Sequence, residues 1–86
     1  MQIEVTAEDI AAGARRSAHH CPIANALERT TRLRWLVSPL GVCPLDLTGQ
    51  AIPPLLALPA TAQVFIESYD RGSAVEPFTF EFPVPV

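Results

Sequence analysis

Hydrophobic residues recur along the chain with two periods, and these periods predict strands and helices in alternation. Ile3 and Val5 stand on either side of Glu4, which is the alternation of a half-buried strand. Near the other end of the chain, apolar residues recur every three or four positions, as on one face of a helix: Ala62, Phe65, Ile66 and Tyr69. The whole pattern predicts strands over 2–6, 35–37, 42–47 and 78–82, and helices over 7–12, 22–30 and 59–71.

Residues that begin or end helices stand at the expected positions. Thr6 precedes the first helix as an N-cap, and Gly13 follows its last residue. Pro22 suits the first turn of the second helix, where a missing N–H costs no hydrogen bond. Pro59 and Gly72 bound the third helix. These local signals support the helix ends independently of the hydrophobic pattern.

Turn residues and prolines shape the middle of the chain. Residues 48–50 form a predicted turn after the strand over 42–47, so the chain from Ala51 onward is expected to return as a hairpin partner. Pro53 and Pro54 cannot donate a backbone hydrogen bond, which restricts that partner to an edge strand or a loop.

Three phenylalanines alternate with polar residues in the last predicted strand: Phe78, Phe80 and Phe82. One face of that strand is therefore aromatic, and the apolar stripe of the third helix is its expected cover. Each buried phenylalanine contributes roughly 1.5–3 kcal/mol. We expect an α+β fold in which helices pack on one face of a small mixed or antiparallel sheet. The 86 residues are expected to form a single domain, 1–86.

The composition excludes two broad classes of protein. Of the residues, 49% are hydrophobic and 17% are charged, a balance too apolar for intrinsic disorder. The longest apolar stretch, Ala51–Ala60, is short and broken by prolines, so we expect no membrane span. The first residues lack a basic leader followed by an apolar run. We therefore expect a cytoplasmic protein, where disulfides are rare, although Cys21 and Cys43 could form one.

The charges are divided unevenly along the chain. Residues 15–34 hold five of the six arginines and one glutamate, about +4, while the remainder carries about −7, which gives the net charge of −3. Arginine suits bidentate contacts with phosphates and carboxylates. The residues expected to bind an anion or an acidic partner are Arg15, Arg16, His19, His20, Cys21, Arg32 and Arg34.

The start of the second helix is the expected centre of this site. Its first backbone N–H groups, those of Ile23 and Ala24, are expected to point outward with the helix dipole. With Arg15 and Arg16 in the preceding loop, they could hold a phosphate, a nucleotide or an acidic side chain. The loop lacks glycine, so it differs from the known phosphate-binding loops. The alternative is that these arginines are ordinary solvated residues.

Cys21 could itself be reactive. Because it stands at a helix start beside His20 and basic residues, its thiol is expected to have a lowered pKa. No acidic or amide partner is recognisable, and the alternative is a small buried residue at a helix cap. The two histidines and two cysteines of the chain also lack the usual spacing of zinc ligands. We therefore predict no catalytic residue, no metal and no cofactor.

Nucleic-acid binding would use the same arginines, with Trp35 available to stack on a base. The net charge of −3 and the pI near 5.1 disfavour this interpretation. Trp35 also lies in an apolar stretch, which favours a place in the core.

Several short segments, read together, form a recognisable series of motifs. They are residues 6–13, Cys21–Leu27 (CPIANAL), Leu58-Pro59, residues 65–70 and Val75–Glu81 (VEPFTFE). The series resembles a family of short uncharacterised proteins of tailed bacteriophages and actinobacterial genomes. The resemblance implies no activity and no catalytic residue. It does imply a phage accessory protein that binds or inhibits a host protein.

The apolar segment Ile52–Leu58 favours a protein partner. Four of its seven residues are leucine or isoleucine. An exposed patch of this kind often marks an interface with another protein or with a second copy of the chain. The alternative is that the segment fills the core. Protein binding without catalysis is thus the leading interpretation, followed by anion or nucleotide binding and then by nucleic-acid binding.

Overall fold

The computed structural model describes residues 1–38 and 41–82. Its elements follow one another as β1 (Gln2–Val5), α1 (Ala7–Ala12), α2 (Pro22–Thr31), β2 (Trp35–Ser38), β3 (Gly41–Pro44), α3 (Ala60–Asp70) and β4 (Phe78–Glu81). The predicted α+β class is confirmed, and each predicted helix end lies within one residue of the observed end. Within the described residues, no helix has the length and apolar character that crossing a bilayer requires.

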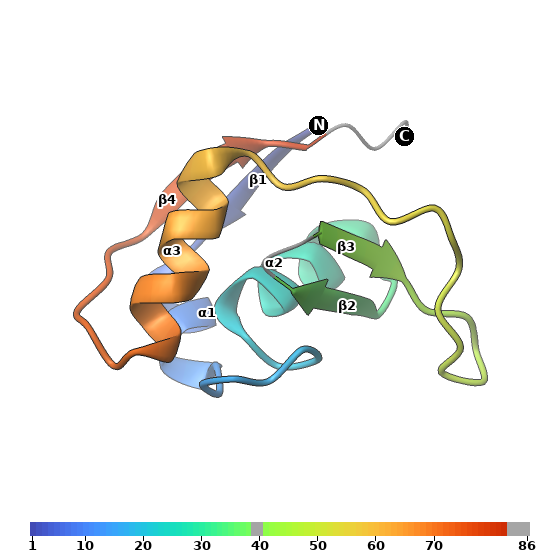
Figure 1. The fold of residues 1–86 in the computed structure, drawn as a ribbon, viewed down its shortest axis with the longest axis horizontal. Coiled ribbons are helices and arrows are strands. Elements are labelled where there is room, and N and C mark those ends of the chain that lie inside the picture. The colour runs from blue at the N-terminus through green and yellow to red at the C-terminus, as the bar shows by residue number, and fades with distance from the viewer. Residues whose placement is uncertain (39–40, 83–86) are drawn as a thin grey trace.

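The described strands form two antiparallel sheets rather than the single sheet that the pattern predicted. β1 pairs with β4, and β2 pairs with β3 as a hairpin. Figure 1 shows β1 and β4 on one side of the molecule and β2 and β3 on the other. The hairpin does not extend the other sheet because its edges are engaged elsewhere. The Val37 N–H donates to the Ala18 carbonyl on one edge, and Val42 pairs with Leu56 on the other.

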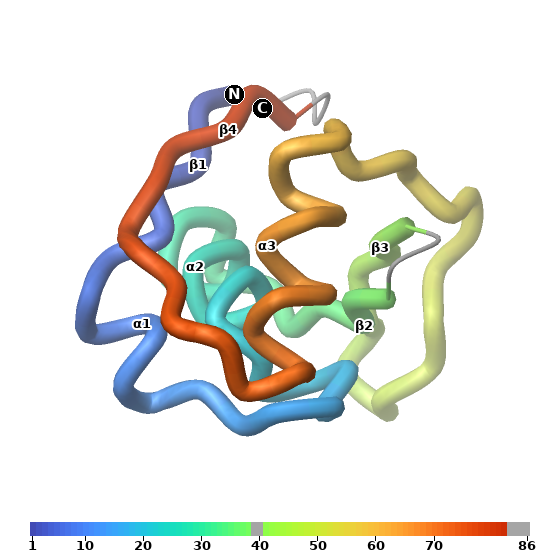
Figure 2. The backbone as a smooth tube through the Cα atoms, turned by 60° about the vertical axis from the view of Figure 1, so that its left-hand side comes forward, coloured from blue at the N-terminus to red at the C-terminus, as the bar shows by residue number. Residues whose placement is uncertain are grey.

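One face of the β1–β4 sheet is apolar, and helices cover it. The register places Ile3 opposite Phe80 and Val5 opposite Phe78, so the four side chains share one face. α2 and α3 lie beside this sheet (Figure 2), and Phe65 of α3 contacts Phe78 with ring centroids 4.7 Å apart. The predicted packing of the third helix on the phenylalanine strand is confirmed.

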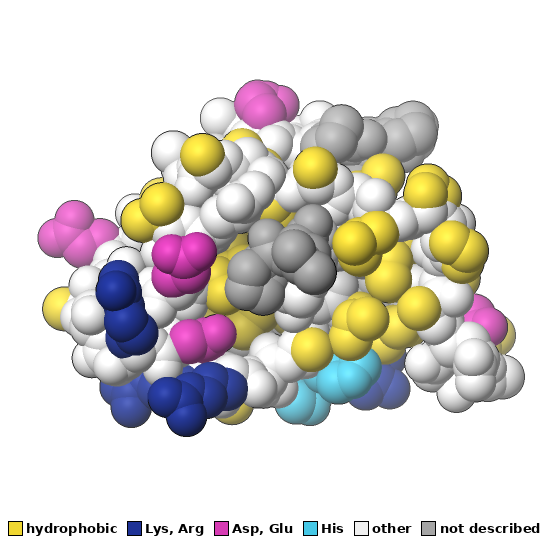
Figure 3. Space-filling view, in the orientation of Figure 1, with side chains coloured by type: hydrophobic (Ala, Val, Ile, Leu, Met, Phe, Trp, Pro, Cys, Tyr) yellow, Lys and Arg dark blue, Asp and Glu magenta, His cyan; other side chains and the backbone are white. Residues whose placement is uncertain are grey.

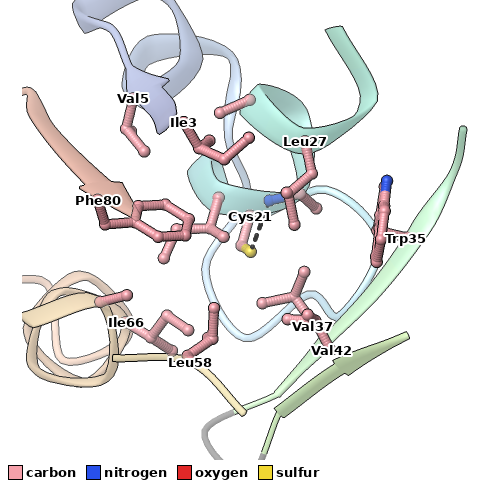
Figure 4. Packing of buried hydrophobic residues seen from close by; sticks show 14 of the residues in the cluster. Ile3, Val5, Cys21, Leu27, Trp35, Val37, Val42, Leu58, Ile66 and Phe80 are labelled. Atoms are coloured by element: carbon pink, nitrogen blue, oxygen red, sulfur yellow. Dashed lines mark hydrogen bonds between the residues drawn. The ribbon is translucent and has the colours of Figure 1, made fainter. Parts of the chain in front are cut away.

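A shared hydrophobic core lies between the two sheets. Its buried members come from every strand and helix except α1. Figure 4 shows side chains of both sheets converging around Cys21. Trp35 on β2 packs edge-on against Phe82, with ring centroids 5.5 Å apart, and so connects the sheets. Trp35 is 3% exposed and its Nε1–H donates to Thr31 Oγ1 at 2.8 Å, which confirms its predicted place in the core.

α1 begins with the cap that its sequence predicts. Thr6 Oγ1 accepts a hydrogen bond from the Asp9 N–H at 3.2 Å, and Asp9 Oδ2 accepts one from the Thr6 N–H at 2.9 Å. Asp9 Oδ2 also accepts from Arg29 Nη2 of α2 at 2.7 Å. Burial raises the pKa of Asp9, but the hydrogen bonds from Arg29 and Thr6 outweigh burial and hold that pKa below its ordinary value.

The proline-rich segment returns beside β3, as predicted. Leu56 and Val42 exchange two backbone hydrogen bonds of 2.7 and 2.8 Å, and Leu45 forms a further bridge with Ala51. Gly41 permits this close approach, because a Cβ there would lie 2.6 Å from the Leu56 carbonyl oxygen.

The segment Ile52–Leu58 is divided between the core and the surface. Leu58 is 3% exposed and belongs to the core, and Leu56 is partly buried against it. Ile52 and Leu55 are 44% and 53% exposed. The core alternative therefore holds for the end of the segment at Leu58, whereas the end at Ile52 is exposed.

Candidate functional site

The basic segment of the sequence does not form one surface. Arg29 lies within α2, where its guanidinium donates to groups of β1 and α1. Arg15 and Arg16 precede α2, whereas Arg32 and Arg34 follow it. The ten residues of α2 separate the two pairs by about 15 Å along the helix axis. Five arginines that are neighbours in sequence therefore lie in three different places.

Arg15 and Arg16 instead join Arg71, which follows the last residue of α3. Together with Asp70 and Gly72 they line a cleft of about 320 Å³. The Arg16 N–H donates to Asp70 Oδ1 at 2.8 Å, and a Cβ at Gly72 would lie 3.5 Å from Arg15 Cζ. Figure 3 shows arginine side chains beside acidic ones on the left of the view. We call Arg15, Arg16 and Arg71 the arginine cluster.

The cleft of the arginine cluster has more cationic than anionic side chains in its lining. Three guanidinium groups line the same cleft as one carboxylate, that of Asp70. The carboxyl end of α3 also favours cations, because the carbonyls of a last helical turn carry partial negative charge. The cleft is therefore lined by more cations than anions, next to the carboxyl end of α3.

His19 and His20 are exposed in the loop before α2. Their ring centroids are 6.4 Å apart and their planes are inclined by 59°, so the rings do not stack. The His20 N–H donates to Ser17 Oγ at 3.1 Å, and the His20 carbonyl accepts from the Ala14 N–H at 2.9 Å. In the part of the chain that the structure describes, no three His, Cys, Asp or Glu side chains are grouped so that they could hold a metal ion.

Cys21 is the N-cap of α2 and is 4% exposed. Its Sγ accepts a hydrogen bond from the Ala24 N–H at 3.4 Å, drawn as a dashed line in Figure 4. Burial raises the pKa of this thiol and the charge of Asp70 raises it further, whereas the N–H groups at the helix start only partly offset the increase. The predicted lowering of the Cys21 pKa is therefore wrong, because desolvation outweighs the helix dipole.

The anion site predicted at the start of α2 is also wrong. Ile23 and Ala24 are 0% and 1% exposed, so their backbone groups lie inside the molecule. The Ala24 N–H already donates to the Cys21 sulfur. A thiol of the chain itself thus takes the position in which an external anion was expected.

Arg32 and Arg34 have defined backbone roles and exposed side chains. Arg32 is the left-handed C-cap of α2, with φ of 62°, and its N–H donates to the Glu28 carbonyl at 2.7 Å. The Arg34 carbonyl accepts from the Leu45 N–H at 2.8 Å. Both arginines follow α2, on the far side of that helix from the arginine cluster. The structure therefore brings Arg15 and Arg16 together, and Arg16 and Cys21 line one pocket, but Arg32 and Arg34 lie at the other end of α2.

The second candidate site is apolar and lies at the end of β3 and on the segment that returns beside it. Leu47 is 107% exposed in the turn after β3. All five residues of 51–55 are apolar and exposed. Figure 3 shows hydrophobic side chains gathered over the right of the molecule, where this segment runs in Figure 1. We call Leu47 together with Ala51–Leu55 the apolar surface.

Two residues of these sites were not recognised in the sequence. Leu47 was assigned to a strand, although its place directly before the predicted turn at 48–50 was a signal for exposure. Arg71 falls at the end of the predicted helix 59–71 and was not among the predicted site residues. The stop signal at Gly72 was the available indication that Arg71 lies at a helix end, where it can meet arginines of another segment.

The comparisons with known proteins do not assign the chain to a family. No protein-family model, curated protein or solved structure matches it. The functional interpretation therefore depends on the chain's own surfaces.

Proposed function

We propose that this protein is a non-enzymatic binding module that docks onto another protein, in the cytoplasm, through its apolar surface. The observation that carries the proposal is the exposure of Leu47 and of the five successive apolar residues Ala51–Leu55. Apolar side chains gathered at one place on a small domain often mark a protein interface, because leaving them in water is unfavourable.

Hydrogen bonds order the turn that carries Leu47 before any partner binds. In the turn that carries Leu47, Asp46 Oδ1 accepts from Thr48 Oγ1 at 2.6 Å, from the Thr48 N–H at 2.8 Å and from the Gln50 N–H at 3.0 Å. These bonds, the one from the Thr48 hydroxyl first, hold the pKa of Asp46 below its usual value. A surface that is already ordered loses little conformational entropy on binding.

The class of partner follows from the resemblance to short proteins of tailed bacteriophages and actinobacterial genomes. A phage accessory protein acts on a component of its host, so a host protein is the proposed partner and inhibition is a natural outcome. Each leucine that becomes fully buried in such an interface contributes roughly 1.5–3 kcal/mol. The competing occupant of the same surface is a second copy of the chain.

The combined variant Leu47→Ser and Leu55→Ser tests the proposal. Immobilised wild-type protein should retain a host protein from a nuclease-treated actinobacterial lysate, and the variant should retain at least about tenfold less of the same protein. Val64→Ser is the matched control, because Val64 is also an exposed apolar residue, at 60%, but lies on α3. Circular dichroism and thermal unfolding confirm that each variant folds.

Retention of the same partner by the wild type and by the Leu47/Leu55 variant would contradict the proposal. Size-exclusion chromatography with light scattering measures the oligomeric state and so distinguishes a second copy of the chain from a host protein. A wild-type dimer that the variant converts into a monomer would show that the apolar surface binds a second copy instead of a host protein.

The arginine cluster favours a second candidate function, the binding of a phosphate-bearing ligand. Its support is that Arg71 joins Arg15 and Arg16 in a cleft with a single carboxylate. Guanidinium groups suit bidentate contacts with phosphate. Such exposed contacts should weaken as salt screens charges beyond about 8–10 Å.

Isothermal titration with inorganic pyrophosphate at low and high salt tests this second candidate. Arg15→Gln combined with Arg71→Gln should weaken binding, and the difference should shrink at high salt. Arg32→Gln combined with Arg34→Gln removes the same charge at the other end of α2 and serves as the control. Equal affinities of the two double variants at both salts would mean that the arginine cluster is ordinary surface.

A further inference from the structure

One edge of β4 is paired with β1, and the other edge is paired with no strand of the described residues. Next to β4, the backbones of Met1 and Phe82 exchange both hydrogen bonds, at 2.8 and 3.0 Å. Because bonded pairs alternate along an antiparallel ladder, the N–H and C=O groups of Thr79 and Glu81 point away from β1. No hydrogen bond from elsewhere in residues 1–38 or 41–82 reaches these groups. β4 thus offers donors and acceptors for another strand.

A groove separates this free edge from α3. It has a volume of about 590 Å³ and is lined by the first turns of α3 and by the chain around the start of β4: Ala60, Thr61, Val64, Phe65, Glu76, Pro77, Phe78 and Thr79. Val64 is 60% exposed, and the rings of Phe65 and Phe78 meet across the groove with centroids 4.7 Å apart. The groove therefore places apolar side chains directly beside an unpaired strand edge.

The charged side chains at this place have one sign. Glu76 lines the groove, and no arginine lines it among the described residues. Glu81 on the same strand is exposed, but its carboxylate lies 3.8 Å from the Met1 ammonium. Arg71 follows the opposite end of α3, about 16 Å away along the helix axis. A ligand that enters the groove therefore meets the negative charge of Glu76.

We propose that this edge and groove bind an extended basic peptide, which adds to the β1–β4 sheet as a third strand. Its backbone bonds to the free groups of Thr79 and Glu81, and an apolar side chain enters the groove against Val64 and Phe78. A lysine or arginine of the peptide meets Glu76. This site is separate from the apolar surface and does not depend on it.

A second copy of the chain fits the same edge less well. Pairing through β4 would bring the carboxylates of Glu76 and Glu81 from both copies onto one short sheet, where like charges repel. Pro77 has no N–H and stands directly before β4, which limits the usable edge to the 4 residues of the strand. A short edge of this kind suits a short peptide and resists open-ended association.

Selection from a displayed library of short random peptides tests the proposal. Peptides enriched on the wild-type protein should alternate apolar residues with others and should carry lysine or arginine. Val64→Ser should bind them about tenfold more weakly, since it removes apolar contact area from the groove wall. Glu76→Gln should weaken the basic peptides and leave their neutral analogues unchanged.

Amide hydrogen exchange with a saturating enriched peptide identifies the binding mode. Exchange at Thr79 and Glu81 should slow at least about tenfold, whereas the Gln2 and Glu4 amides, on the outer edge of β1, should be unchanged. Failure to enrich any peptide, or enriched peptides that leave Thr79 and Glu81 unprotected, would overturn the proposal. The Leu47/Leu55 variant should bind the same peptides normally, so this proposal and the proposed function can fail separately.

Discussion

Arg29 and Asp9 form an ion pair, with 2.7 Å between Nη2 and Oδ2, that joins α2 to the amino end of α1. The Asp9 side chain is 8% exposed and the Arg29 side chain 50%, so a nearly buried carboxylate is matched by a cation that reaches it from the surface. A buried carboxylate without such a partner is costly. The pair also explains why the positive charge of residues 15–34 is not all available for a ligand.

Asp9→Asn should lower the free energy of unfolding by about 1–3 kcal/mol near neutral pH, because charged hydrogen bonds from Arg29 and Thr6 lose their acceptor charge. The pKa of Asp9 is lowered in the folded state, so its stabilisation is complete above the ordinary value of 3.8 and is lost as the pH falls through the lower folded-state value. Chemical denaturation at a series of pH values should show the two proteins converging in acid. A difference that stays constant far below pH 3.8 would contradict the assignment.

Phe80→Ala should destabilise the fold by about 3–5 kcal/mol, which is a large part of the stability of so small a domain. Phe80 is 4% exposed and stands opposite Ile3 in the core-facing row of the β1–β4 sheet. Thr79→Ala is the control, because Thr79 is exposed on the other face of the same strand. Denaturant midpoints compare the two variants, and equal midpoints would contradict the assignment of Phe80 to the core-facing row.

Local signals were sufficient to predict most of the secondary structure. Thr6 and Gly13 bound α1 where the sequence placed it, and Pro22 begins α2 as expected. The stripe on α3 and the alternating phenylalanines of β4 were correctly matched, because each has a single face that requires burial. Caps and periodicities act over a few residues, so they can be recognised without knowledge of the tertiary fold.

Features that depend on distant parts of the chain could not be predicted. The two sheets separate because Val42 pairs with Leu56 and the Val37 N–H bonds to the Ala18 carbonyl. The turn at 48–50 predicted the first of these pairings, but the second has no local signature. The observed grouping of the arginines differs from the predicted one because it also depends on residues far away in the sequence. Arg29 forms an ion pair with Asp9, 20 residues earlier in the chain. Arg15 lies in one cleft with Arg71, which follows the end of α3.

Cys21 should react slowly with iodoacetamide at neutral pH in the folded protein, no faster than a small free thiol. Burial raises the pKa of the Cys21 thiol and also limits access to it, since the residue is only 4% exposed. Cys43, at 5% exposed, should be slow as well. In the protein unfolded by denaturant, iodoacetamide should alkylate both thiols at equal rates. Rapid alkylation of Cys21 alone in the native state would contradict the buried N-cap geometry.

Gly41→Ala should destabilise the protein more than Gly49→Ala. Both glycines have positive φ, 155° and 87°, so both variants carry backbone strain of about 1–3 kcal/mol. Only at Gly41 does a Cβ also collide with the chain, 2.6 Å from the Leu56 carbonyl oxygen, whereas nothing lies within 4 Å at Gly49. Thermal unfolding measures the difference. Equal losses would show that the Leu56 segment is not held against β3.

Site-specific photo-cross-linking tests whether the protein docks onto a host protein through the apolar surface. A photoreactive amino acid in place of Leu55 should form a covalent adduct with one host protein in an actinobacterial lysate. The same amino acid in place of Glu28, an exposed residue of α2, should form none. We expect an adduct from position 55 alone, because only that position lies on the apolar surface. Adducts from both positions in equal yield, or from neither, would contradict it.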